Sequence, residues 1–136
     1  MVRPMTPARA LVVDDSAASR RLLRSILSSM GFKISTAMDG RAAWELHAGR
    51  PFDVIVTDWV MPNMDGYELV RALRTSGDTT PVLVVSGYRD GETRDLCTRF
   101  EKVAWLGKPL DLAELRSSLR SILRPSPHAR PKPASS

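Results

Sequence analysis

Five short apolar runs alternate along the chain with five longer segments in which apolar residues recur at helical spacing. The runs cover residues 10–13, 32–37, 53–57, 81–86 and 103–106, and the segments cover residues 22–30, 39–49, 65–77, 90–100 and 111–123. Short runs rich in β-branched residues predict strands buried on both faces, and helical spacing predicts amphipathic helices. Strict alternation of the two predicts an α/β fold with a doubly wound, five-stranded parallel sheet and helices on both faces.

Cap residues and apolar faces define the expected helices. Asp39 and Asp65 precede the second and third helical segments as N-caps. The expected apolar faces include Leu22 in the first helix, Leu46 in the second, and Leu112 and Leu123 in the last. The fourth segment is mostly polar with few apolar anchors, so we expect its helix to be the most weakly held of the five.

Residues 8–124 form one expected domain, and residues 125–136 differ from it in composition. These last residues contain four of the ten prolines and no large apolar residue. Such a segment buries too little apolar surface to offset the entropy of folding. We therefore predict a disordered tail or the stub of a linker.

The composition is that of an ordinary globular domain. The 136 residues are 43% hydrophobic and 26% charged, and no apolar stretch approaches the roughly 20 residues of a membrane span. The N-terminus lacks the apolar core of a secretory signal, and the single cysteine, Cys97, excludes an internal disulfide. We expect a soluble, cytoplasmic domain without membrane insertion.

A net charge of +5 raises the question of nucleic-acid binding. The 20 Lys and Arg residues are dispersed, however, and form no run interleaved with aromatic residues. A mixed, solvated surface explains the charge better, so we expect no direct contact with nucleic acid.

Chemically distinctive residues follow four of the expected strands: Asp14 and Asp15, Asp58, Ser86, and Lys108. In a parallel sheet the carboxyl ends of all strands meet at one edge, where open α/β sheets bind their ligands. Two carboxylates about 4 Å apart repel by roughly 4 kcal/mol at a surface-like dielectric constant, so such a cluster needs a cation. Oxygen ligands favour Mg²⁺ before Ca²⁺. A carboxylate nucleophile, a metal and an ammonium clamp are the parts that phosphoryl transfer requires.

These residues stand within motifs that resemble a known family. The motifs are LVVDD at 11–15, DWVMPNMDG at 58–66, SG at 86–87 and KP at 108–109. In this order and at these separations they resemble the receiver domains of response regulators, most of all the single-domain chemotaxis (CheY-like) type. The resemblance spans residues 8–124 and implies a flavodoxin-like sheet with strand order 2-1-3-4-5.

The resemblance also implies roles for the acidic residues. Asp58 corresponds to the aspartate that accepts a phosphoryl group from the phosphohistidine of a histidine kinase or a histidine phosphotransfer protein. Asp15 corresponds to a direct Mg²⁺ ligand, and Asp14 to one that acts mainly through metal-bound water. Asp58 itself and the backbone carbonyl of Val60 correspond to the remaining protein ligands of the metal.

Three further positions correspond to the parts that sense the phosphoryl group. Lys108 corresponds to the residue that pairs with it, and Ser86 to the switch hydroxyl that hydrogen-bonds one of its oxygens. The Lys108–Pro109 bond corresponds to a cis peptide. Trp105 occupies the position of the switch aromatic, usually Tyr or Phe, which is a departure from the family pattern.

A second departure precedes the fifth strand, where the family has a Gly-Ala pair and this chain has Glu101 and Lys102. A left-handed residue is less favourable without glycine, so we expect this corner to be looser or differently shaped. The two histidines, His47 and His128, are expected to be solvated and without a role.

The function implied is that of a phosphorylation-controlled binding switch and not of an enzyme with a separate substrate. Its output protein would bind the face formed by the fourth helix, fifth strand and fifth helix, and phosphorylation could also drive dimerisation. Three alternatives remain open: a receiver module of a hybrid histidine kinase or larger regulator, a scaffold receiver that is never phosphorylated, and a phosphohydrolase with an aspartate nucleophile. The hydrolase is disfavoured because no second acid lies two positions after Asp58.

Overall fold

The computed structural model describes residues 7–87 and 91–123. Within these residues, strands and helices alternate as predicted. The strands are β1 (Arg9–Val13), β2 (Lys33–Ala37), β3 (Val54–Thr57), β4 (Val82–Ser86) and β5 (Val103–Gly107). The helices are α1 (Ala17–Ser29), α2 (Gly40–Gly49), α3 (Gly66–Thr75), α4 (Gly91–Thr98) and α5 (Leu112–Leu123). None of the described helices is long and apolar enough to cross a membrane.

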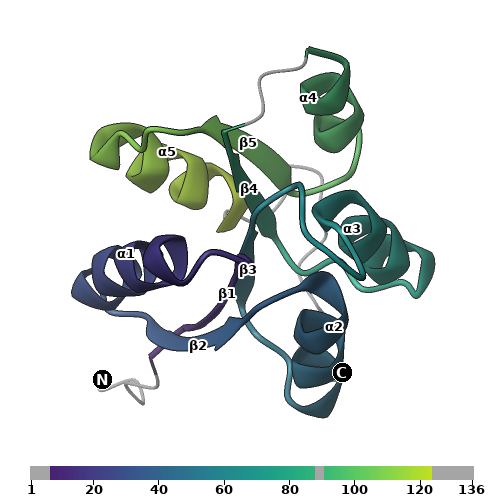
Figure 1. Cartoon of the computed structure of the whole chain (residues 1–136), viewed down its shortest axis with the longest axis horizontal. Coiled ribbons are helices and arrows are strands. Elements are labelled where there is room, and N and C mark those ends of the chain that lie inside the picture. The colour runs from purple at the N-terminus through teal and green to yellow at the C-terminus, as the bar shows by residue number, and fades with distance from the viewer. Residues whose placement is uncertain (1–6, 88–90, 124–136) are drawn as a thin grey trace, which may run out of the picture.

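The five strands form one parallel sheet in the order β2-β1-β3-β4-β5. Figure 1 shows the sheet between two helical layers, with α1 and α5 on one face and α2, α3 and α4 on the other. The predicted doubly wound, flavodoxin-like fold is therefore confirmed. Because every pair of strands is parallel, the carboxyl ends of all five strands lie at the same edge.

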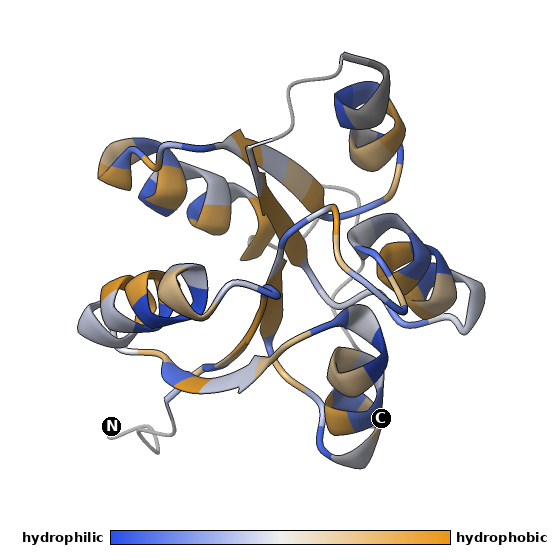
Figure 2. Ribbon diagram, viewed as in Figure 1, coloured by the Kyte–Doolittle hydropathy of each residue, from blue (hydrophilic) through white to orange (hydrophobic). Residues whose placement is uncertain are grey.

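The core consists of two apolar clusters, one on each face of the sheet. Alternate residues of a strand enter opposite clusters: Leu11 and Val13 pack on the side of α2 and α3, and Ala10 and Val12 on the side of α1 and α5. Strands β1, β3 and β4 are hydrophobic almost throughout, whereas the helices carry their apolar residues mainly on the inner side (Figure 2). Burial of each large side chain contributes roughly 1.5–3 kcal/mol, so the central strands hold the sheet edge in place.

The predicted caps are present, but four leucines that were assigned to the apolar faces of helices lie at the surface. Asp39 accepts a hydrogen bond from the Ala42 N–H, and Asp65 forms a capping box with Glu68. The assignment to the apolar faces was wrong for Leu22, Leu46, Leu112 and Leu123, which are exposed, Leu22 and Leu112 by more than half. Each has an apolar side chain but lies beside the buried stripe of its helix, which the spacing of the other leucines defines.

The corner between α4 and β5 retains a left-handed residue despite the absence of glycine. Lys102 has a φ of 55°, a conformation that disfavours any residue with a Cβ by roughly 1–2 kcal/mol. The backbone on both sides of it is hydrogen-bonded: the Phe100 N–H donates to the Cys97 carbonyl, and the Val82 N–H of β4 donates to the Lys102 carbonyl. The corner is thus a defined turn that leads directly into β5.

Candidate functional site

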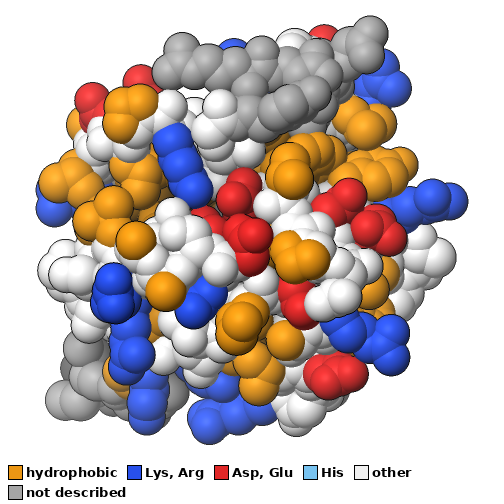
Figure 3. All heavy atoms as spheres, viewed as in Figure 1, with side chains coloured by type: hydrophobic (Ala, Val, Ile, Leu, Met, Phe, Trp, Pro, Cys, Tyr) orange, Lys and Arg blue, Asp and Glu red, His pale blue; other side chains and the backbone are white. Residues whose placement is uncertain are grey.

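The carboxyl edge of the sheet brings the predicted acidic residues together. Asp14 follows β1, and Asp58 follows β3 at the centre of the sheet. Among the described residues, Asp14, Asp15 and Asp58 form a group in which one carboxylate oxygen of each lies within 4.8 Å of the others. Figure 3 shows acidic side chains gathered near the middle of one face, with hydrophobic side chains around them.

The three carboxylates differ in exposure. Asp14 is 1% exposed, and its Oδ1 accepts a hydrogen bond from the Ser16 N–H at 2.9 Å. Asp15 is exposed and Asp58 is partly buried. One fixed, one partly covered and one exposed acid offer an all-oxygen ligand set that water molecules can complete. This donor set fits a hard divalent cation such as Mg²⁺.

Lys108 lies among these acids. Its Nζ is 3.2 Å from Asp14 Oδ2 and 3.8 Å from Asp58 Oδ2, and it also donates to the Ser19 hydroxyl at 3.4 Å. The ammonium is therefore closer to Asp14 and Ser19 than to Asp58. The Lys108–Pro109 peptide bond is cis, as the resemblance implies.

The environment of Asp58 disfavours its negative charge. Burial raises the pKa of this carboxyl above its usual value and the Asp14 charge adds to the increase, while Lys108 and hydrogen bonds from the Trp59 N–H and the Ser86 hydroxyl offset only part of it. The Trp59 N–H donates to Asp58 Oδ1 at 2.7 Å. One carboxylate oxygen is thus held by the backbone, and the other, Oδ2, faces Lys108.

The remaining predicted site residues lie around this cluster. Ser86 is 2% exposed and next to Asp58. The Val60 side chain is 60% exposed in the loop after β3. Trp105 is partly buried and packs edge-on against Trp59, with ring centroids 6.1 Å apart. The ring of Trp105 therefore contacts the residue next to Asp58, and its switching role stays a prediction.

Gly66 supports the site in a way that the sequence analysis missed. Its N–H donates to the Trp59 carbonyl at 2.9 Å, and a Cβ at this position would lie 2.5 Å from the Asp58 carbonyl oxygen. The first residue of α3 therefore packs directly on the backbone of Asp58. The sequence identified a turn ending at this glycine, but the close approach exists only in the folded chain.

Two residues of α1 that the sequence analysis did not select also contact the site. Ser19 accepts from Lys108, and Arg20 donates from Nη1 to the Asp14 carbonyl at 2.7 Å. Both lie one turn after Ser16, the N-cap of this helix. Their spacing of three and four residues from the cap could have indicated that they face the end of β1.

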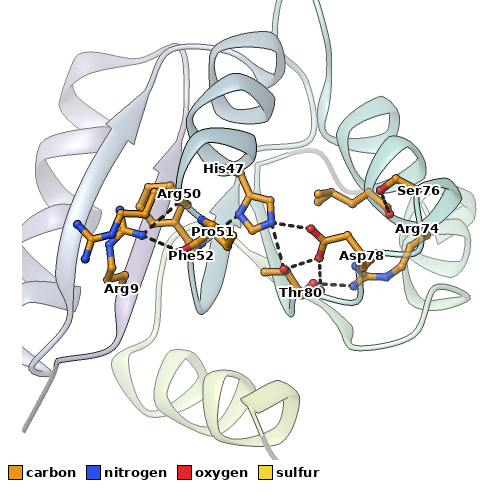
Figure 4. A network of polar contacts seen from close by, with 10 residues as sticks. Arg9, His47, Arg50, Pro51, Phe52, Arg74, Ser76, Asp78 and Thr80 are labelled. Carbon is orange, nitrogen blue, oxygen red and sulfur yellow. Dashed lines mark hydrogen bonds and ion pairs between the residues drawn. The ribbon is translucent and has the colours of Figure 1, made fainter. Parts of the chain in front are cut away.

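The prediction that His47 is solvated is wrong. Its side chain is 4% exposed, its Nδ1 accepts from the Phe52 N–H at 3.1 Å, and its Nε2 lies 2.7 Å from Asp78 Oδ2. Figure 4 shows the ring between Phe52 on one side and Asp78 and Thr80 on the other. Asp78 comes from the loop before β4, 31 residues away, so the pairing had no local sequence signal. His128 lies outside the described residues.

The arrangement agrees with comparisons against known proteins. Residues 10–120 match the family model of the response regulator receiver domain. The chain is 40% identical over 118 residues to the response regulator MprA of Mycolicibacterium vanbaalenii, an alignment that covers 87% of this chain and 51% of that protein. It is also 38% identical over 109 residues to the sensor histidine kinase RcsC of Salmonella typhi, covering 80% of this chain and 12% of the kinase.

The structure is similar to that of the chemotaxis response regulator CheY4 of Vibrio cholerae, with a TM-score of 0.76, 33% identity, and coverage of 86% of this chain and 99% of that chain. The present chain spans about half the length of MprA and a small part of RcsC. The matched family, the CheY-like neighbour and the cluster of acids at the carboxyl edge agree with one another. The chain belongs to the response regulator receiver domain family.

Proposed function

We propose that this domain is the phosphoacceptor of a two-component phosphorelay, and that Asp58 receives the phosphoryl group. The donor is the phosphohistidine of a histidine kinase or of a histidine phosphotransfer protein. The observation that carries the proposal is the meeting of Asp14, Asp15 and Asp58 within 4.8 Å, with the Lys108 ammonium beside them.

Asp58 is suited to the role of nucleophile because its two oxygens are unequal. The Trp59 N–H holds Oδ1, while Oδ2 faces Lys108. In the transfer, a carboxylate oxygen of Asp58 forms a bond to phosphorus, the bond from phosphorus to the donor imidazole nitrogen breaks, and the imidazole leaves with its electron pair. Asp14, Asp15, Asp58 and the Val60 carbonyl would hold Mg²⁺, which when bound neutralises charge on the phosphoryl oxygens.

Lys108 and Ser86 then detect the product. The Lys108 ammonium lies within 4 Å of both Asp14 and Asp58, so a short movement of its side chain brings it to a phosphoryl oxygen. The Ser86 hydroxyl turns to donate to another. These shifts bias the surface of α4, β5 and α5, which carries Trp105, between two states that an output protein distinguishes. The same residues assist hydrolysis of the aspartyl phosphate, and no separate substrate is turned over.

The larger context of the domain is also a matter of proposal. The domain limits 8–124 stay a prediction, and the tail 125–136 lies outside the described residues. The relatives include a response regulator about twice as long and a much longer sensor kinase, which supports a regulator with an output domain or a hybrid kinase as alternatives to a free-standing protein. Phosphorylation-linked dimerisation, a cytoplasmic location and the lack of direct nucleic-acid contact stay predictions.

The test is the intact mass of the protein after incubation with Mg²⁺ and acetyl phosphate. Wild type should gain one phosphoryl group, and Asp58→Asn should gain none. Asp53→Asn, a change at the opposite edge of the sheet, should behave as wild type, and EDTA should prevent the gain. An unmodified wild type, or an equally modified Asp58→Asn, would refute the assignment. Sustained release of phosphate from a phosphomonoester would favour the hydrolase instead.

A further inference from the structure

Arg74 at the end of α3 binds two separate segments of backbone at the amino-terminal edge of the sheet. Its Nε and Nη2 donate to the Glu101 carbonyl at 3.1 and 2.7 Å. Its Nη1 donates to the Asp78 carbonyl at 2.8 Å, and Nη2 also donates to the Thr80 carbonyl at 2.8 Å. Through these four hydrogen bonds, the guanidinium joins the loop before β4 to the corner before β5.

The corner that Arg74 binds contains the departure from the family pattern noted above. Glu101 precedes Lys102, whose φ of 55° is unfavourable for a residue with a Cβ. On the other side of this residue, the Lys102 carbonyl accepts from the Val82 N–H at 3.0 Å. Lys102 is thus held between the hydrogen bonds that Arg74 of α3 donates to Glu101 and the first backbone hydrogen bond between β4 and β5.

The loop side of the clamp is itself held in place. Asp78 Oδ1 accepts from the Thr80 N–H at 2.8 Å, and Oδ2 pairs with Nε2 of the buried His47. These contacts fix the loop carbonyls of Asp78 and Thr80, to which Arg74 donates. Figure 4 shows the guanidinium next to both residues. A network that begins on α2 therefore ends at the corner just before β5.

Two residues of the candidate site depend on where strand β5 lies: Trp105 within it and Lys108 directly after it. In the described sheet it is an edge strand, paired with β4 alone, and Trp105 pairs in register with Val84. Lys108 directly follows its last residue, Gly107. We infer that Arg74 is a positioning residue that fixes the start of β5 and thereby places Trp105 and Lys108. This goes beyond the proposed phosphotransfer, because it holds whether or not Asp58 is phosphorylated.

Arginine suits this role better than lysine would. The planar guanidinium presents its N–H groups in a fixed fork and can bind three carbonyls at once, whereas an ammonium is a single point of donation on a flexible stem. Arg71, one turn earlier on the same helix, is exposed and provides the matched control. The tested pair is therefore Arg74→Lys and Arg71→Lys, which both keep the charge.

The experiment is amide hydrogen exchange on the unphosphorylated protein without Mg²⁺. Arg74→Lys should speed exchange of the Val82 amide and of the β5 amides about tenfold, the effect of losing one or more charged hydrogen bonds, while amides of β1 and β3 change little. The indole N–H resonance of Trp105 should shift. Arg71→Lys should leave both readouts as in wild type.

A second substitution makes the test specific for the corner. Lys102→Gly removes the penalty of the left-handed conformation, so it should restore most of the protection lost in Arg74→Lys and should slow Val82 exchange when made alone. Equal acceleration in all five strands, failure of Lys102→Gly to rescue, or an equal effect of Arg71→Lys would each overturn the inference. If Arg74→Lys does not fold, an unchanged Val82 exchange rate in Lys102→Gly alone would overturn it.

Failure of this inference is distinguishable from failure of the proposed function. The exchange readout needs no phosphoryl group, whereas the mass experiment needs no hydrogen exchange. As a link between the two, Arg74→Lys should slow phosphorylation by acetyl phosphate through the displacement of Lys108, and Lys102→Gly should restore that rate as well.

Discussion

The two edges of the sheet each contain a partly buried aspartate with a basic partner, yet the two aspartates behave in opposite ways. At the carboxyl edge the pKa of Asp58 is raised, and at the amino edge the pKa of Asp78 is lowered. Burial is the largest influence on both and raises both. The difference therefore comes from what each carboxylate is bonded to.

Asp78 receives hydrogen bonds from the Thr80 N–H, the Thr80 hydroxyl and His47, which together outweigh the effect of burial. Asp58 lies near a second acid, Asp14, and its ammonium partner is 3.8 Å away. A carboxylate such as that of Asp78, whose oxygens are hydrogen-bonded within the fold, stabilises the folded state. A carboxylate that the fold leaves partly uncompensated gains from a bound cation, which is what the proposed function of Asp58 uses.

The largest expected effect comes from removing the hydrogen bonds of His47 at the amino edge of the sheet. His47→Leu leaves the buried Phe52 N–H and Oδ2 of the partly buried Asp78 without their partner, and we expect it to lower the free energy of unfolding by about 2–4 kcal/mol. Urea denaturation measures this. The control is Glu45→Gln, which removes an exposed ion pair with Arg41 on the same helix and should change stability by less than about 0.5 kcal/mol. A loss no larger than that of the control would contradict the comparison.

The same substitution at the two edges should have opposite signs. In buffer with EDTA, Asp58→Asn should stabilise the fold by about 1 kcal/mol, because it removes a charge that burial disfavours. Asp78→Asn should destabilise it by about 1–2 kcal/mol, because it weakens hydrogen bonds to a charged acceptor.

Added Mg²⁺ sharpens the contrast. At ten times its dissociation constant it should raise the stability of wild type by about 1.4 kcal/mol and that of Asp58→Asn by less. Thermal unfolding with and without Mg²⁺ measures each difference, and changes of the same sign at both edges would remove the basis of the comparison.

The smallest expected effect is the pH dependence of the stability differences between wild type and the variants Asp58→Asn and Asp78→Asn. Because the folded pKa of Asp58 is raised, its charge destabilises the fold at neutral pH, and this penalty disappears as the pH falls through the folded pKa towards the unfolded value of about 4. The advantage of Asp58→Asn should therefore shrink between pH 7 and pH 4. Because the folded pKa of Asp78 is lowered, its stabilisation is full above about pH 4 and is lost below it.

Denaturation of wild type, Asp58→Asn and Asp78→Asn at pH values from 7 to 3 measures these two pH dependences. The deficit of Asp78→Asn should persist to about pH 4 and narrow only below it. A deficit that narrows above pH 5, or an advantage of Asp58→Asn that grows on acidification, would show that the two pKa directions are misassigned.

Much of the carboxyl edge could be predicted from the sequence because its geometry follows from periodicity. Once five parallel strands are recognised, the residue after each strand must lie at one edge, which brings Asp14, Asp58 and Lys108 together without knowledge of any side-chain contact. The caps at Asp39 and Asp65 were predictable for a similar reason, since each acts within four residues of its own position.

The amino edge could not be predicted in this way. His47, Asp78 and Arg74 come from two helices and a loop, and no repeat spacing relates them. Gly66 and Lys102 show the same limit for the backbone, because the close approach of one and the left-handed conformation of the other depend on which segment packs beside them.

The amino-acid sequence by itself determined the order of strands and helices, the family, and the edge at which the acids gather, because these depend on local pattern and on the direction of strands. The tertiary structure alone decided which groups are compensated. Hydrogen bonds from Thr80 in the same loop and from His47 of α2 outweigh the effect of burial at Asp78, whereas the effect of burial prevails at Asp58, and the contacts of Arg74 determine how β5 begins.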